Sequence, residues 1–220
     1  MATATSEKTK PKFDNILEIE QLYAQYCAAK GDQEVLYQRL QERTIVLKPE
    51  EKINEWRRSD GHEDSVFVCL LEDTFPKQFI SKQKNAPLVL EILGSPFALL
   101  EGADQVVVLD SYPMSSYLVD KGLTTILYRN NWITIRDKEN SGSIYSTNLN
   151  LLNHLTPIPK FLLVGNNKEN GTFLNFIRSA EFLQRVPTKN LFAVPGKSGS
   201  YTNQLIKRGW HLCDSANDLI

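Results

Sequence analysis

From residue 64 onward, short apolar and β-branched runs alternate with turn signals and with stretches of helical spacing. Such an alternation is typical of an α/β fold in which helices cover a largely parallel sheet. We therefore predict an α/β domain over residues 64–220, with a mostly parallel sheet flanked by helices. The expected strands are residues 65–71, 88–93, 105–109, 124–128, 132–135, 161–164 and 191–194, the last of them paired inside the sheet, and the expected helices are residues 76–81, 113–121, 149–155, 172–184 and 201–208.

The preceding residues have a different texture, and we predict that they form a small helical module over residues 13–60. Asp14 and Asp32 are suitable N-caps, and Pro49 followed by two glutamates is suited to a first helical turn. Each of these three helix starts is followed by apolar residues at helical spacing. Residues 1–12 are polar, contain no apolar segment typical of a secretory signal, and are expected to be a disordered tail.

The overall charge and the cysteines limit the class of protein. The three cysteines are widely spaced and odd in number, which favours reduced, buried thiols and a cytoplasmic protein over a disulfide framework. The longest apolar runs are too short to span a bilayer. The net charge of −1 excludes a bulk polyelectrolyte binder, but residues 155–220 hold eight basic and four acidic residues, 8 − 4 = +4. That basic segment either faces phosphates or is an ordinary solvated surface.

Common catalytic and metal-binding patterns are missing from the sequence. His211 and Cys213 are the only histidine and cysteine at ligand-pair spacing, so we predict no metal site. Cys27 and Cys69 lie in apolar segments and are expected in the core rather than as nucleophiles. Residues 196–198 imitate the end of a phosphate-binding Walker motif, but Leu191 stands where that motif needs its first glycine. No cofactor and no catalytic residue are therefore predicted.

The most specific segment of the chain is residues 192–220, FAVPGKSGSYTNQLIKRGWHLCDSANDLI. It resembles the C-terminal part of the DprA/Smf family of Rossmann-type DNA-processing proteins, in which a strand ending in F-A-V-P-G precedes a Gly/Ser loop, T-N-x-L-I-x-x-G-A and S-A-x-D-I/L. The matching positions are Phe192 to Gly196, Thr202, Asn203, Leu205, Ile206, Gly209, Ser215, Ala216, Asp218 and Leu219. The resemblance implies a Rossmann-like fold, single-stranded DNA as a ligand, and a non-catalytic role beside recombination machinery.

Several departures from the family leave other functions open. The family's G-S-R turn corresponds to Asp110, Ser111 and Tyr112, and the arginine of its R-N pair corresponds to Thr147. A chain that lacks these basic groups is also consistent with a DprA-like regulatory protein, such as an antitoxin or defence partner that has lost DNA binding. A third alternative is a nucleotide-cleaving enzyme of the LOG type, which shares a similar core. That class uses a glutamate after its P-G-G loop, whereas residues 195–204 contain no acid.

Two loops at the carboxyl ends of expected strands form the predicted ligand site. Lys168 and Lys197 are expected to contact phosphate, Tyr201 to stack on a base, and the remaining polar and glycine residues to donate hydrogen bonds or let the backbone approach. These remaining residues are Gly171, Thr172, Gly196, Ser198, Ser200, Thr202 and Asn203. The family likeness also implies a homodimer, with an interface expected at Leu205, Ile206, Trp210 and Leu212, although these residues are equally suited to packing on the sheet.

Overall fold

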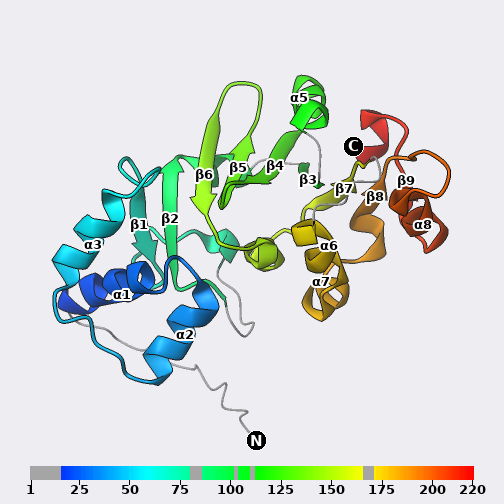
Figure 1. Ribbon diagram of the computed structural model, residues 1–220. Helices are drawn as coiled ribbons and strands as arrows, with labels where there is room; N and C mark the ends of the chain where they lie inside the picture. Colours follow the sequence, from blue (N-terminus) through cyan, green and yellow to red (C-terminus); the bar gives the residue numbers. More distant parts are fainter. Residues whose placement is uncertain (1–15, 80–85, 102–103, 110–111, 166–170) are drawn as a thin grey trace, which may run out of the picture.

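The computed structural model describes residues 16–79, 86–101, 104–109, 112–165 and 171–220, and these residues form an α/β structure around one mixed sheet (Figure 1). The predicted tail over residues 1–12 and the predicted cap Asp14 lie outside the described residues. No helix within the described ranges is long and apolar enough to cross a membrane.

The N-terminal helices begin where capping chemistry favours a helix. They are α1 (Ile16–Ala28), α2 (Gln33–Gln41) and α3 (Pro49–Arg57). The side chain of Asp32 accepts hydrogen bonds from the backbone N–H groups of Glu34 and Val35, and therefore caps α2 as predicted. Pro49 occupies the first turn of α3, where its missing N–H group costs nothing.

The described residues contribute nine strands to the sheet, in the order β1-β2-β6-β5-β4-β3-β7-β8-β9. The sheet has a parallel half and an antiparallel half, and β4 belongs to both. Neighbouring strands are parallel from β4 through β3, β7 and β8 to β9. They are antiparallel from β1 through β2, β6 and β5 to β4. The strands are β1 (Val66–Cys69), β2 (Val89–Gly94), β3 (Gln105–Leu109), β4 (Thr124–Arg129), β5 (Trp132–Arg136), β6 (Ser141–Tyr145), β7 (Lys160–Leu163), β8 (Leu191–Ala193) and β9 (His211–Leu212).

The expectation of a mostly parallel sheet therefore holds for one half only, and the reason is a pair of tight hairpins. Asn130 and Asn131 join β4 to β5 with φ of 50° and 63°, the positive values that a two-residue hairpin turn requires. Strands joined by so short a turn are necessarily antiparallel. The next turn is closed by the Asp137 carboxylate, which accepts hydrogen bonds from the backbone N–H groups of Glu139 and Asn140. Strand β6 follows this turn and was not predicted, because its sequence is rich in serine and glycine.

Alternating residues of the parallel strands divide the core into two layers. Val107 and Leu109 of β3 belong to the cluster under α6 (Gly171–Arg178), α7 (Ala180–Arg185) and α8 (Tyr201–Lys207). Val106 and Val108 face the opposite side, where the cluster includes residues of α5 (Tyr112–Asp120) and of the short η4 (Ala216–Leu219). Figure 1 shows α5 and the α6–α7 pair on opposite sides of the sheet. As predicted, residues 191–193 form an interior strand, since β8 pairs with both β7 and β9.

Some predicted helices differ in extent. The helix expected over residues 172–184 is two helices, because Ser179 leaves the helical conformation and its side chain accepts a hydrogen bond from the Phe182 backbone to cap α7. Residues 149–154 form a 3-10 helix, η2 (Leu149–His154), and Lys77–Phe79 form η1. The end of the helix predicted over 76–81 lies outside the described residues. Neither α4 (Pro96–Leu100) nor the two-residue β9 was predicted.

A fully buried carboxyl group joins the helical module to the sheet. Glu91 of β2 is 0 % exposed. Its Oε1 lies 2.6 Å from the Ser65 hydroxyl and 2.7 Å from Nδ1 of His62, and its Oε2 accepts a 3.1 Å hydrogen bond from Nε1 of Trp56 on α3. The imidazole of His62 also lies against the Trp56 ring, with centroids 4.3 Å apart. These contacts hold the C-terminal half of α3 over the antiparallel end of the sheet.

All three cysteines are free and buried, as predicted. Burial raises the pKa of the Cys27 thiol to about 12 and that of Cys213 to about 11, and it raises the pKa of Cys69 as well. Because the thiolate is the reactive form, the native protein should react with a thiol reagent about 100-fold or more slowly than the unfolded chain. Counting reactive thiols with and without urea checks this, and one rapidly labelled thiol in the native protein would contradict it.

Candidate nucleic-acid interface

The predicted loop follows β8 at the carboxyl edge of the parallel strands and leads directly into α8. Asn203, in the first turn of α8, fixes the shape of this loop. Its side-chain Nδ2 donates to the carbonyl oxygens of Gly196 and Lys197, at 3.1 Å each, and its Oδ1 accepts from the Gly196 N–H at 3.1 Å. One amide side chain thereby satisfies three backbone groups that the end of the strand leaves free.

Two hydroxyl groups support the loop from inside. The N-cap of α8 is Ser200, whose Oγ accepts a 3.3 Å hydrogen bond from the Asn203 N–H, and Thr202 Oγ1 lies 3.0 Å from the same oxygen. Both hydroxyl-bearing residues are buried. A Cβ atom on Gly196 would approach Ser200 Oγ to 2.6 Å, so this position has no room for a side chain. Ser200, Thr202 and Asn203 therefore hold the loop in this conformation, and their predicted role as phosphate donors remains a prediction.

The exposed part of the loop carries a cation and lies beside an aromatic ring. Lys197 and Ser198 are exposed, and Gly199 has a φ of 82°, which lets the backbone turn toward α8. Tyr201 is half-buried, and the guanidinium of Arg178 lies 5.1 Å from the centroid of its ring. Arg178 ends α6 and is itself exposed. The loop thus exposes one cation, Lys197, and a second cation, Arg178, contacts the Tyr201 ring where α8 begins.

Sequence reasoning did not assign Arg178 to the site, because the helix break at Ser179 had to be recognised before the end of α6 could be placed. Lys168 lies outside the described residues, and Gly171 and Thr172 begin α6. The same basic segment includes Lys207 and Arg208. They end α8, so the whole helix separates them from the loop. Lys197 and the pair of Lys207 and Arg208 therefore lie at opposite ends of α8.

Two acidic residues of the same segment, Asp214 and Asp218, lie on the other side of the sheet. Asp218 accepts hydrogen bonds from the backbone N–H groups of Ser215 and Asp214, which lower the pKa of its carboxyl group. This turn leads into η4, whose Ala216 and Leu219 pack in the cluster that includes residues of α5. The Arg178–Tyr201 pair belongs to the opposite layer, where Tyr201 packs against the other cluster. The positive groups at the loop are consequently not paired with these acids.

The residues predicted for a dimer interface are mostly used within the chain. Leu205 and Trp210 are buried in the cluster under α6 to α8, and Ile206 packs against it. Leu212 alone of the four is a clearly exposed apolar side chain, at 48 %. An apolar patch made of all four residues is thus not present on the surface, and dimerisation remains a prediction that must rest on other contacts. Within the described ranges, no group of three His, Cys, Asp or Glu residues could hold a metal ion.

Comparisons with protein-family models, with curated proteins and with solved structures gave no match. The resemblance to the DprA/Smf family thus rests on sequence motifs, and it is strongest over residues 192–220.

Proposed function

We propose that this chain is a DprA-like, non-catalytic protein that binds single-stranded DNA at the loop between β8 and α8. In this proposal the parallel strands, in the order β4-β3-β7-β8-β9, form a Rossmann-like core. The order reverses between β3 and β7, as at the switch point of doubly wound folds, and the proposed loop ends the next parallel strand, β8, at the same carboxyl edge. A cytoplasmic protein acting with recombination machinery fits this reading.

The observation that carries the proposal is the contact of Arg178 with the Tyr201 ring at the start of α8, beside a loop that exposes Lys197. Proteins that bind single strands without sequence preference combine cations along the backbone with aromatic rings on which bases stack. Here the ring of Tyr201 is held by Arg178 on one side of a loop that Asn203 makes rigid. A rigid loop reduces the ordering cost of binding. Lys197 and Arg178 would contact phosphates and Tyr201 a base.

The test is a titration of a labelled oligothymidine by fluorescence anisotropy at several salt concentrations. The Arg178→Ala/Lys197→Ala double variant should bind about tenfold or more weakly, because each phosphate contact contributes release of counterions. The slope of log affinity against log salt should fall by about 1.4 for two lost contacts on a single strand. Tyr201→Ala should weaken binding by about 1–3 kcal/mol, through loss of stacking on one base.

The matched control is the Lys207→Ala/Arg208→Ala variant, which removes the same charge from the far end of α8 and should leave affinity and slope near those of the wild type. Equal losses in both double variants would show a diffuse charge effect and contradict a site at the loop. If the wild-type protein does not bind at low salt, the regulatory or antitoxin-like alternative replaces this proposal.

A further inference from the structure

The connection between α2 and α3 places two large apolar side chains in solvent. Ile45 and Leu47 are 71 % and 93 % exposed, the highest values among the large apolar residues in the described ranges. Thr44 and Val46, which alternate with them, are half-buried. Alternation of covered and exposed side chains is the pattern of an extended segment with one face against the protein.

Two glutamines one turn apart on α1 hold this segment extended. In the amide orientation that satisfies both backbone groups of Val46, Gln21 accepts from the Val46 N–H at 2.7 Å and donates to its carbonyl oxygen at 3.2 Å. Gln25 donates through Nε2 to the carbonyl oxygen of Thr44. Four residues of an α-helix rise about 6 Å, and two residues of an extended chain span about 6.6 Å. The spacing of the two glutamines therefore matches an extended chain over residues 44–46.

The backbone groups of Ile45 and Leu47 are directed the other way. In an extended chain, the N–H and C=O groups of successive residues point to opposite edges, so those of residues 45 and 47 point away from α1. No described residue donates to these two carbonyl groups or accepts from these two N–H groups. The segment thus presents an open strand edge beside exposed apolar side chains, which is a template for pairing with another chain.

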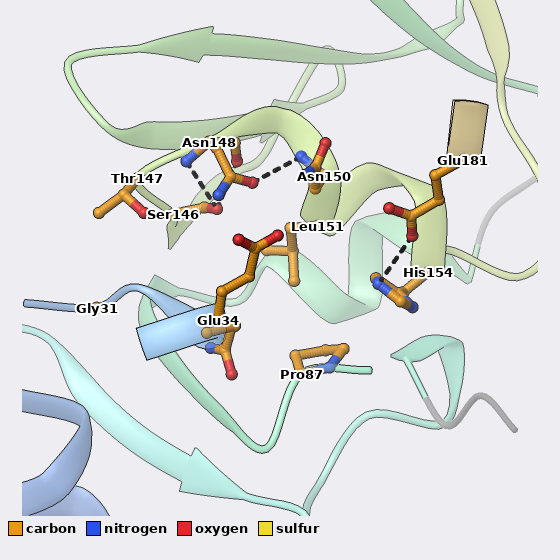
Figure 2. Close-up of a pocket in the computed structure, with 11 residues that line it drawn as sticks. Gly31, Glu34, Pro87, Ser146, Thr147, Asn148, Asn150, Leu151, His154 and Glu181 are labelled. Atoms are coloured by element: carbon orange, nitrogen blue, oxygen red, sulfur yellow. Dashed lines mark hydrogen bonds and ion pairs between the residues drawn. The ribbon is translucent and has the colours of Figure 1, made fainter. Parts of the chain in front are cut away.

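This edge lies on the outside of the helical module. The N-terminal end of α2 is directed toward the rest of the chain, and Figure 2 shows Gly31 and Glu34 near Pro87 and Leu151 around a small pocket. The other end of α2 leads into the connection to α3, which Figure 1 shows at the outer margin of the module. Residues 1–12 contain no valine, leucine, isoleucine or aromatic residue to cover the exposed side chains.

We propose that residues 44–48 of two copies of this chain pair as antiparallel strands centred on Val46, and that this pairing forms a homodimer. In this register Ile45 of each copy lies opposite Leu47 of the other, so the outward N–H and C=O groups of all four residues are satisfied. The exposed apolar side chains become cross-strand neighbours. The interface is separate from the β8–α8 loop, so it does not depend on DNA binding.

The charges at the two ends of the segment favour a second copy in this orientation. Arg43 precedes the segment and has no ion pair within the described part of the chain. Glu50 and Glu51 follow it in the first turn of α3, where Glu51 pairs with Lys48 at 2.7 Å. Antiparallel pairing brings Arg43 of one copy toward these acids of the other, twice by symmetry. Parallel pairing would instead place like charges side by side.

The first experiment is sedimentation equilibrium of the full chain between about 1 and 200 µM, because so small an interface should be weak, with a Kd on the order of 10 µM or above. Ile45→Lys and Leu47→Lys should each raise the Kd about tenfold or more, since a charge then lies on the pairing edge. Both side chains are exposed, so both variants should keep the fold. The matched control is Leu183→Lys, which changes an exposed leucine on α7 and should leave the Kd unchanged. A monomeric wild type over this range, or equal weakening by all three variants, overturns the proposal.

The second experiment tests the register by cross-linking. Val46 faces itself across the two-fold axis at a non-hydrogen-bonded position, where Cα atoms lie about 4.5 Å apart, within the range of a disulfide. Val46→Cys should therefore form a disulfide-linked dimer with copper–phenanthroline as the oxidant. The two copies of residue 47 are displaced by two positions, more than about 7 Å apart, so Leu47→Cys should cross-link at least about tenfold more slowly. The native cysteines are buried and should contribute little. Equal rates in the two variants, or faster cross-linking of Leu47→Cys, contradict pairing about Val46.

Discussion

Replacing Glu91 by alanine should lower the free energy of unfolding by about 3–5 kcal/mol, because it removes an acceptor from a site that water cannot refill. The variant leaves His62 Nδ1 and Trp56 Nε1 without the partners they have at 2.7 and 3.1 Å. Each unpaired buried donor costs about 1–3 kcal/mol. For a domain of ordinary stability, this loss is a large fraction of the total free energy of unfolding. Urea unfolding followed by tryptophan fluorescence measures it, since Trp56 belongs to the network.

Two further variants give this prediction a graded control. Ser65→Ala removes one donor and leaves two around the Glu91 carboxyl group, so it should cost about 1 kcal/mol. Glu91→Gln keeps one acceptor oxygen and should fall between the two. A Glu91→Ala variant within about 1 kcal/mol of the wild type would show that the network contributes little to stability.

Phe182→Ala should cost a comparable amount, about 3–5 kcal/mol, through a cavity in the larger core cluster. Phe182 is 0 % exposed, and its ring lies 5.0 Å from that of Phe161 and 4.9 Å from that of Phe176, measured between centroids. The edge-to-face contacts with both rings disappear together with the buried area. Because strand β7 and helices α6 and α7 all contribute to this cluster, the space cannot collapse easily.

The adjacent residue provides the control for this second prediction. Leu183 lies next to Phe182 on α7 but is 61 % exposed, so Leu183→Ala should change the free energy of unfolding by less than about 0.5 kcal/mol. Thermal and urea unfolding of the two variants at equal concentration measure the difference. Similar losses in both would mean that the helix itself, and not the packing of Phe182, limits stability.

The sequence was most informative where local signals are strong. The apolar run of β3 and the cap at Asp32 were both placed at the right residues. The direction of neighbouring strands was harder, because it depends on turns: the Asn130–Asn131 pair is a hairpin signal that the strand–helix alternation concealed. Strand β6 pairs through its backbone and carries few of the residues that favour strands, so periodicity did not reveal it.

For the candidate site, the position of the loop could be predicted from the sequence, but the hydrogen bonds made by its side chains could not. The Gly/Ser loop after β8 lies at the expected edge, yet Asn203 and Ser200 hold its backbone instead of being free toward solvent. Arg178 is far from the motif in sequence and reaches Tyr201 only through the packing of α6 against the sheet.

The pairing of β2 with β6 also bears on how the chain folds during synthesis. These strands meet at Ile92 and Ile144, while α4, β3, α5, β4 and β5 are all encoded between them. Long-range pairings of this kind close late, because the entropy of the intervening loop must be overcome first. Until Tyr145 has left the ribosome, β2 has an open edge on the side opposite β1. The N-terminal helices with β1 and β2 would therefore emerge first, as a species prone to pairing with other chains. Addition of β6, after β4 and β5, would cover the open edge of β2.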